Sequence, residues 1–356
     1  MNPNPFTPDY RNILDVLDNR KPARLPLYEH AIDPPFIRKM ITRDLSIQGT
    51  HAKDYQDYYE TVCGFWNDMT YDSFAYEAAI CDLLPGHGAI NGGMAGPIQT
   101  RSDFERYPFD EFPDLFWKTY TPHLEAIRLI LPPGMKVWGG CGYGIFETSE
   151  DLVGFENLAV MQYLDPELFA DLYRKIGDLF ATLWAEMVRR YSDIYVFFRM
   201  GDDIGFKTST FFEPDVIRQH LIPQYKRVID IVHGAKKKFL LHSCGNIFPV
   251  MNDLISAGID AKHSNEDQIA AFDEWISRYS GRIGLLGGID VNDLCLNSYD
   301  DVFRMVVEKG TRFRNSANGF GLGSGNSNAG YVQVEGFTAM VDAAKVIREG
   351  VRTLRT

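Results

Sequence analysis

The chain of 356 residues carries 48 acidic and 36 basic side chains, which gives a formal net charge of −12. Surfaces that bind nucleic acid or anionic membranes need clustered lysine and arginine, so this acidic balance argues against both partners. The five cysteines are scattered and odd in number, which disfavours a disulfide framework and indicates a reducing compartment. The first residues lack the pattern of a signal peptide, and no apolar run approaches the ~20 residues of a spanning helix. We therefore expect a cytoplasmic protein that binds neither nucleic acid nor membrane.

Strand and helix patterns alternate along the chain, with no composition break that would mark a linker. Short apolar runs bounded by turn residues predict strands at 24–30, 71–75, 135–141, 194–200, 239–244, 259–263, 282–286 and 319–323. Apolar residues at helical spacing predict helices at 7–20, 55–65, 115–131, 165–190, 214–235, 270–278, 299–309 and 334–349. Eight strands, each followed by a helix, predict an α/β fold, a (β/α)₈ TIM barrel in a single domain over residues 1–356. A doubly wound open sheet is the alternative, because one wrong strand would change the count.

Two segments stand outside this alternation. Residues 1–23 predict an N-terminal helical arm, with Pro22 closing its helix. Residues 81–113, after the second expected strand, are rich in glycine and proline and show no long helical period. We expect a short insertion of loops or small strands there.

The motif His242-Ser243-Cys244 ends the fifth expected strand, just before Gly245-Asn246. Positions two apart on a strand face the same side, so His242 and Cys244 project together. Imidazole and thiolate are two of the ligand types that zinc prefers. The competing interpretation is that both side chains are ordinary members of a buried core.

In a barrel the C-terminal ends of all strands meet at one face. The expected strand ends carry many polar groups, and we assign substrate binding to seven of them: Tyr28, His30, Arg199, His263, Asp290, Ser324 and Asn326. Such a concentration is more typical of a site than of a core.

A third zinc ligand has few candidates in this inventory. Glu29 could supply a carboxylate from the first strand, whereas Cys295 fits the core of the following helix better. Ser324 is a neutral hydroxyl and therefore a poor zinc ligand. Glycine at every second position from Gly319 to Gly325 predicts either a phosphate loop or a close-packed barrel rim, and the pattern does not separate the two.

Several short motifs together resemble the uroporphyrinogen decarboxylase superfamily. They are His242-Ser243-Cys244-Gly245-Asn246, the segment 258–263 (GIDAKH), the Gly-Gly-Ile-Asp of 287–290, and Gly96-Pro97 with 104–108 (FERYP). The resemblance spans nearly the whole chain and implies the (β/α)₈ barrel expected above. Decarboxylases of this superfamily carry an Arg- and Gln-rich segment after the first strand, where this chain has 28–33 (YEHAID). Acidic residues there would repel an octa-acid substrate.

The other branch comprises methylcobalamin:coenzyme M methyltransferases and related corrinoid-dependent methyltransferases. The resemblance to it implies a zinc ion on His242 and Cys244; the branch's later cysteine would fall in 319–326, where Ser324 is the nearest equivalent. We expect Glu29 to complete the metal site, and Glu29, Asp202 and Tyr143 to act in catalysis.

The implied activity moves a methyl group between a small methylated substrate, such as a methoxy compound, or a thiol, and cobalamin. The chain lacks an Asp-x-His-x-x-Gly corrinoid signature, so we expect cobalamin on a separate corrinoid protein; a homodimer is the expected assembly to test. Two alternatives stay open. One is a metal-free decarboxylase of a small or tetrapyrrole acid in which Asp202, Asp203 or Tyr143 handles protons; the other is a non-catalytic barrel that binds a corrinoid or tetrapyrrole.

Overall fold

Seven parallel strands form the central sheet of the computed structural model, which describes residues 6–92 and 94–350. Their order in the sheet follows the chain: β1 Ser73–Ala79, β2 Lys136–Gly142, β3 Tyr195–Gly201, β4 Phe239–His242, β5 Ala261–His263, β6 Gly284–Ile289 and β7 Phe320–Ser324. Every residue of β3 and β4 is buried, as expected for parallel strands that are covered on both faces. Each of these strands overlaps one of the last seven predicted from the sequence, so the α/β class and the parallel sheet are confirmed.

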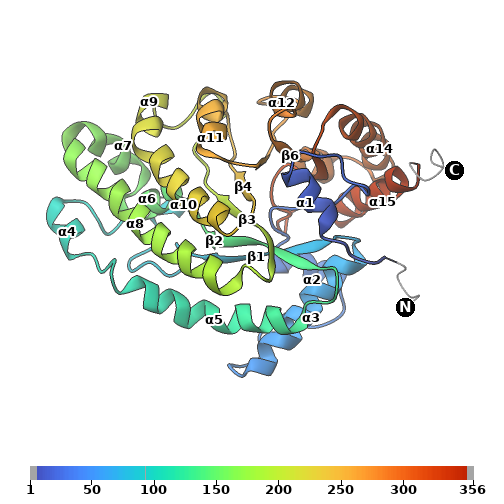
Figure 1. Ribbon diagram of the computed structural model, residues 1–356, viewed down its shortest axis with the longest axis horizontal. Helices are drawn as coiled ribbons and strands as arrows, with labels where there is room; N and C mark the ends of the chain where they lie inside the picture. The colour runs from blue at the N-terminus through green and yellow to red at the C-terminus, as the bar shows by residue number, and fades with distance from the viewer. Residues whose placement is uncertain (1–5, 93, 351–356) are drawn as a thin grey trace.

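Helices lie outside the strands, with α8 on one side and α14 and α15 on the other (Figure 1). The α-helices are α1 Arg11–Leu17, α2 Pro34–Met40, α3 Ala52–Asp68, α4 Arg101–Arg106, α5 Phe112–Ile130, α6 Ile145–Val153, α7 Phe155–Leu164, α8 Pro166–Tyr191, α9 Pro214–Val216, α10 Ile222–Gly234, α11 Met251–Ala257, α12 Phe272–Tyr279, α13 Val291–Leu296, α14 Tyr299–Ser316 and α15 Val334–Gly350. Short 3₁₀ turns at Ala89–Asn91 and Phe248–Val250 and a π-helical stretch at Ile217–Leu221 complete the helical elements. None of the helices in the described ranges is long and apolar enough to cross a membrane.

The first expected strand, 24–30, does not form a regular strand. It contributes an isolated parallel bridge between Leu27 and Leu322 of β7, with the Tyr28 N–H donating to the Leu322 carbonyl over 2.9 Å. Pro26 in its middle has no N–H and cannot extend a ladder on both sides. Arg24 pairs instead with the Asp72 carboxylate just before β1, so the segment links β7 to the start of β1 through one bridge and side chains.

Helix α1 closes the end of the sheet where the strands begin. A Cβ on Gly284 or Gly319 would lie 2.2 or 2.5 Å from the Val16 carbonyl oxygen, so only glycine lets the helix approach so closely. The expected N-terminal arm is thus packed against the starts of β6 and β7. This leaves the opposite end, where the strands finish, for a site.

The glycine- and proline-rich segment 81–113 contains the 3₁₀ turn at Ala89–Asn91, helix α4 and the first residues of α5, joined by turns. Its described residues form none of the seven strands, so the small strands that the composition allowed are absent from that part of the segment.

Candidate functional site

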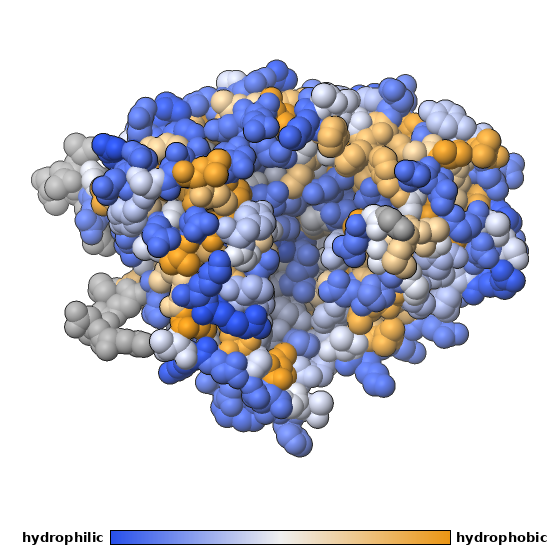
Figure 2. All heavy atoms as spheres, turned by 180° about the vertical axis from the view of Figure 1, so that it is seen from behind, coloured by the Kyte–Doolittle hydropathy of each residue, from blue (hydrophilic) through white to orange (hydrophobic). Residues whose placement is uncertain are grey.

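A cavity of about 500 Å³ opens where the strands end. Its lining includes His30 from the bridging segment, Glu77 from β1, Arg199 from β3, His242 from β4 and Asn326 after β7. Figure 2 shows a hollow near the centre of one face of the molecule, with hydrophilic residues in its depth and apolar patches around it. The convergence of strand ends expected from the sequence therefore produces a cavity rather than a filled core.

His242 and Asp203 line this cavity, and Cys244 lies directly beside them. The His242 Nε2 atom lies 3.5 Å from the Cys244 sulfur and 3.8 Å from Asp203 Oδ1. One donor atom of each residue lies within 4.8 Å of the others, a spacing that suits a shared metal ion. The Cys244 backbone N–H donates to Asp203 Oδ1 over 2.7 Å, which ties the loop after β3 to the loop after β4.

Local backbone geometry fixes this meeting point. His242 is the last residue of β4 and pairs with Gly201, the last residue of β3, so the residues that follow both strands emerge side by side. Gly245 has φ +78°, and a Cβ there would lie 2.2 Å from the Gly205 carbonyl. The turn that presents Cys244 therefore requires glycine.

A chain of hydrogen bonds sets the tautomer of His242. The His263 Nε2 atom lies 2.9 Å from the Ser324 carbonyl, which can only accept, so His263 carries its proton on Nε2. The His242 and His263 Nδ1 atoms are 2.7 Å apart, and His242 must then donate from Nδ1. Burial lowers the pKa of His263 to about 3 and holds the pKa of His242 well below its ordinary value, which keeps both rings neutral. The lone pair on His242 Nε2 is thereby left facing Cys244.

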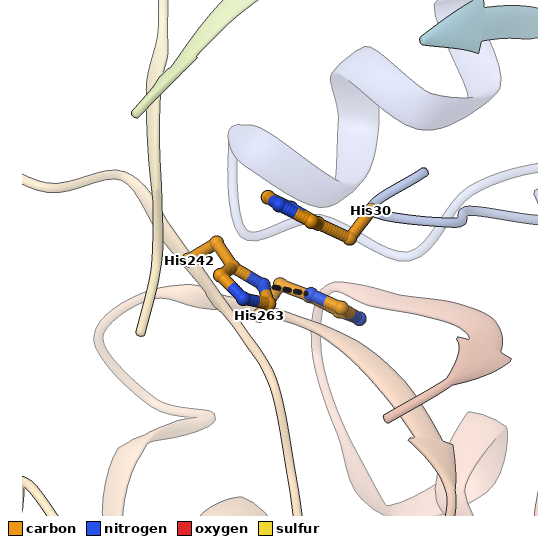
Figure 3. Close-up of side chains that lie close together, drawn as sticks. All are labelled: His30, His242 and His263. Carbon is orange, nitrogen blue, oxygen red and sulfur yellow. Dashed lines mark hydrogen bonds between the residues drawn. The ribbon is translucent and has the colours of Figure 1, made fainter. Parts of the chain in front are cut away.

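His30 stacks on His242 with ring centroids 3.6 Å apart and planes inclined by 22° (Figure 3). Nitrogen atoms of His30, His242 and His263 also lie within 4.8 Å of one another. Imidazole lone pairs lie in the plane of the ring, so two rings stacked face to face cannot both direct them at one ion. The group of His242, Cys244 and Asp203 is therefore the better metal site.

The Cys244 sulfur accepts two further hydrogen bonds. The Ser264 hydroxyl donates over 3.4 Å and the Asn326 side-chain amide over 3.3 Å. Burial, followed by the charge of Asp203, raises the pKa of this thiol, so its proton faces the His242 lone pair. A metal ion would replace that proton and leave both donors in place on the sulfur.

Glu29, expected to be the third ligand, lies elsewhere. Its fully buried carboxylate accepts from the Ser324 N–H and hydroxyl, from Asn328 Nδ2 over 2.7 Å and from the Tyr71 hydroxyl over 3.1 Å. We call Glu29, Ser324, Asn328 and Tyr71 the Glu29 clamp. The clamp fastens the bridging segment to the loop after β7, and it also takes the Ser324 side chain away from Cys244.

Asp202 and Asp290 act on helix ends. Asp202 is fully buried and accepts from the Phe146 and Glu147 N–H groups, both over 2.9 Å, at the start of α6, and from the Tyr225 hydroxyl. Asp290 accepts from two backbone N–H groups, one of them at the start of α13. Neither lines the cavity, in contrast to the catalytic and substrate-binding roles expected for them.

Tyr28 is also buried away from the cavity, with its ring 4.9 Å from those of Trp138 and His263. Arg199 lines the cavity but is bonded to Glu77 over 2.6 Å and to the His30 carbonyl. Tyr143 lines the cavity as well, and its hydroxyl lies 3.5 Å from Asp82 Oδ1.

Sequence reasoning passed over Asp203 as a ligand and did not consider Glu147 or Ser264. Asp203 follows Asp202 directly after a strand, and the pattern alone does not say which of the two turns into the site. No signal in the sequence distinguishes Glu147 from other acidic residues of helix starts.

Comparisons with known proteins agree with this architecture. The family model described as Uroporphyrinogen decarboxylase (URO-D) matches residues 81–347. Among solved structures, a methyltransferase from Methanosarcina mazei is similar with a TM-score of 0.74 at 15% identity, covering 96% of this chain and 99% of that one. A B12-independent methionine synthase from Shewanella sp. W3-18-1, in complex with selenomethionine, has a TM-score of 0.51 at 13% identity over 94% and 96% of the two chains. No curated protein sequence matches.

Proposed function

Because the chain belongs to the uroporphyrinogen decarboxylase family, we propose that it is a methyltransferase that moves a methyl group between a small methylated compound and a corrinoid on a separate protein. The observation that carries this proposal is the convergence of His242 Nε2, Cys244 Sγ and Asp203 Oδ1 within 4.8 Å beside a substrate-sized cavity. The fold likeness to a methyltransferase and a methionine synthase is in keeping with it.

The donor set fits zinc. Imidazole nitrogen, thiolate and carboxylate are its common ligands, and three protein ligands with an open position are typical of catalytic zinc. In this proposal Asp203 takes the place that the sequence suggested for Glu29. A zinc ion there would act as a Lewis acid on the heteroatom that carries the methyl group. His263 orients His242 through the Nδ1 contact of 2.7 Å, the kind of outer support that metal-binding histidines usually have.

In the demethylating direction the bond between the methyl carbon and its heteroatom breaks, with the electron pair remaining on the heteroatom. When bound, the partner's reduced corrinoid would supply the electron pair that takes up the methyl carbon, and the leaving heteroatom would take up one proton from a residue of this chain. Tyr143 is the candidate donor, because it lines the cavity and burial raises its pKa, which keeps it protonated at neutral pH. The corrinoid partner would dock over the open mouth of the cavity.

Decarboxylation of an acid is less well supported. A carboxylate substrate needs a free cation to hold it, and Arg199, the basic side chain of the cavity lining, is committed to Glu77 and to the His30 carbonyl.

The test is the metal content of protein purified without chelator. We expect about one zinc per chain in the wild type and in Glu29→Gln, and little in the His242→Ala/Cys244→Ala double variant or in Asp203→Ala. Zinc-loaded protein should then methylate reduced cobalamin from a panel of methoxy and methylamino compounds. Wild-type protein without metal would refute the zinc site, whereas metal without methyl transfer would favour a binding protein.

A further inference from the structure

Among the charged side chains that line the cavity, carboxylates outnumber cations. Glu77, Glu147 and Asp203 are its carboxylates, and Arg199 is its strongly basic side chain. Arg199 and Glu77 neutralise each other at 2.6 Å. If zinc binds as proposed, its two charges are balanced by the Cys244 thiolate and Asp203. Glu147 is then left as a carboxylate that no positive group in this lining offsets.

Glu147 is held firmly at the cavity wall. It lies in the first turn of α6, where its backbone N–H donates to Asp202 over 2.9 Å and its Oε2 accepts from the Gly144 N–H over 3.1 Å. Burial, then the carboxylates of Asp203 and Asp202, hold its pKa well above the ordinary value. Glu147 is half-buried, and a carboxylate so placed among other carboxylates is unfavourable in its charged form unless a cation lies against it.

Aromatic side chains form much of the remaining lining: Tyr58, Tyr59 and Trp66 from α3, Tyr76 from β1 and Tyr143 after β2. Electron-rich rings attract organic cations, most strongly where water is excluded. Glu147 belongs to neither metal-competent group of the described residues. A carboxylate in an aromatic-lined cavity, outside both metal-competent groups, fits an organic cation better than a second metal ion.

We propose that the small molecule bound in this cavity carries an ammonium group, recognised by Glu147 and the aromatic wall. The methyl-bearing heteroatom would lie at the other end, near His242, Cys244 and Asp203. Glu147, Tyr76 and Tyr143 come from the β1 and β2 side of the sheet and the two ligands of 242–244 from β4, so one molecule can span both groups. This inference rests on the proposed function for the chemistry at the second end. For recognition of the cation it needs only the cavity.

Binding can be measured by calorimetry without corrinoid and without turnover. Two cations and their neutral analogues serve as probes: choline with 3,3-dimethyl-1-butanol, and phenethylammonium with phenethyl alcohol. We expect each cation to bind at least about 10-fold more tightly than its neutral partner, as for a charge-assisted contact. Glu147→Gln, which keeps an oxygen for the Gly144 N–H, should remove most of this preference and leave the neutral compounds unchanged.

Two further variants make the result specific. Glu308→Gln removes an exposed carboxylate on α14 and should change nothing. Tyr143→Leu should weaken the cations, whereas Tyr143→Phe, which keeps the ring, should retain them. Failure of both cations to bind, equal binding of the neutral analogues, or a preference that survives Glu147→Gln would each overturn the inference.

The two proposals fail in different ways. Methyl transfer from a neutral methoxy compound, with no cation bound, would leave the proposed function standing and refute the ammonium group. Tight, Glu147-dependent binding of a cation, with no metal and no methyl transfer, would support the ammonium group and refute the proposed function.

Discussion

Replacing Glu29 by glutamine separates a structural carboxylate from a metal ligand. Burial raises the pKa of Glu29 from the ordinary 4.5 to about 7, against its hydrogen bonds, which lower it. Between these values the folded protein holds a proton that the unfolded chain has lost, so the free energy of unfolding falls as the pH rises. A difference of roughly 2.5 pKa units corresponds to about 3 kcal/mol. Glutamine does not titrate, so the variant lacks this contribution.

The measurement is urea unfolding of both proteins, followed by tryptophan fluorescence at intervals from pH 5 to pH 8. At pH 5 the protonated Glu29 presents one O–H, which a hydroxyl of the Glu29 clamp can turn to accept, whereas glutamine presents two N–H groups. The wild type should therefore be the more stable at pH 5, by about 1–3 kcal/mol for a buried group left unpaired. That advantage should shrink by about 2–3 kcal/mol towards pH 8. Parallel pH profiles would refute the burial argument. Loss of zinc in Glu29→Gln, with zinc retained in Asp203→Asn, would restore Glu29 as the ligand.

Two predictions concern the groups around the metal ligands. Asn326→Ala removes the amide that donates to the cysteine sulfur, and zinc should bind about 10-fold more weakly in competition with a chelator. Asn297→Ala, which removes an exposed amide at the end of α13, is the matched control and should leave zinc affinity unchanged. His263→Phe keeps a ring but removes the nitrogen that accepts from His242 and fixes its tautomer, so zinc affinity should fall about 10- to 100-fold. Wild-type affinity in this variant would contradict the proposed role of this hydrogen bond.

Most of the fold could be predicted from the sequence, because an apolar run of strand length indicates a strand without information from distant parts of the chain. It overestimated the segment 24–30, which has the apolar pattern of a strand but carries Pro26 within it. The sequence shows that Pro26 lacks an N–H. It does not show which edge of the strand faces the neighbouring strand, and the effect of the missing N–H depends on that. The segment forms an isolated bridge at Leu27 that side chains reinforce, and the described residues contain seven regular strands.

Part of the site could also be predicted from the sequence, because some of its residues are neighbours along the chain. The period of two placed His242 and Cys244 on one side of the chain, and they lie 3.5 Å apart at Nε2 and Sγ. Glu29 has an equally suggestive place in the sequence, at the expected end of a strand. Its partners Ser324 and Asn328 come almost 300 residues later in the chain. Their hydrogen bonds to its carboxylate make Glu29 a structural residue, and the sequence does not show that these residues meet. Which of two adjacent aspartates enters the cavity depends likewise on the helix start that captures Asp202.

The cavity has two regions, and different residues determine the charge of each. The metal region is formed by His242, Cys244 and Asp203, and the second region by Glu147 and the aromatic wall. At the metal region the Ser324 carbonyl fixes the proton of His263, which fixes that of His242, so the ligand nitrogen is neutral and its lone pair is free. If zinc binds as proposed, a thiolate and a carboxylate balance its charge, and the metal ligands contribute no net charge to substrate selection. In that case we expect Glu147 to select the charge of the substrate, because Arg199 is already paired with Glu77. His263→Phe should therefore change metal affinity without changing the preference for cations, and Glu147→Gln should do the opposite. Substitution of Asp203 should change both, because its charge also acts on Glu147.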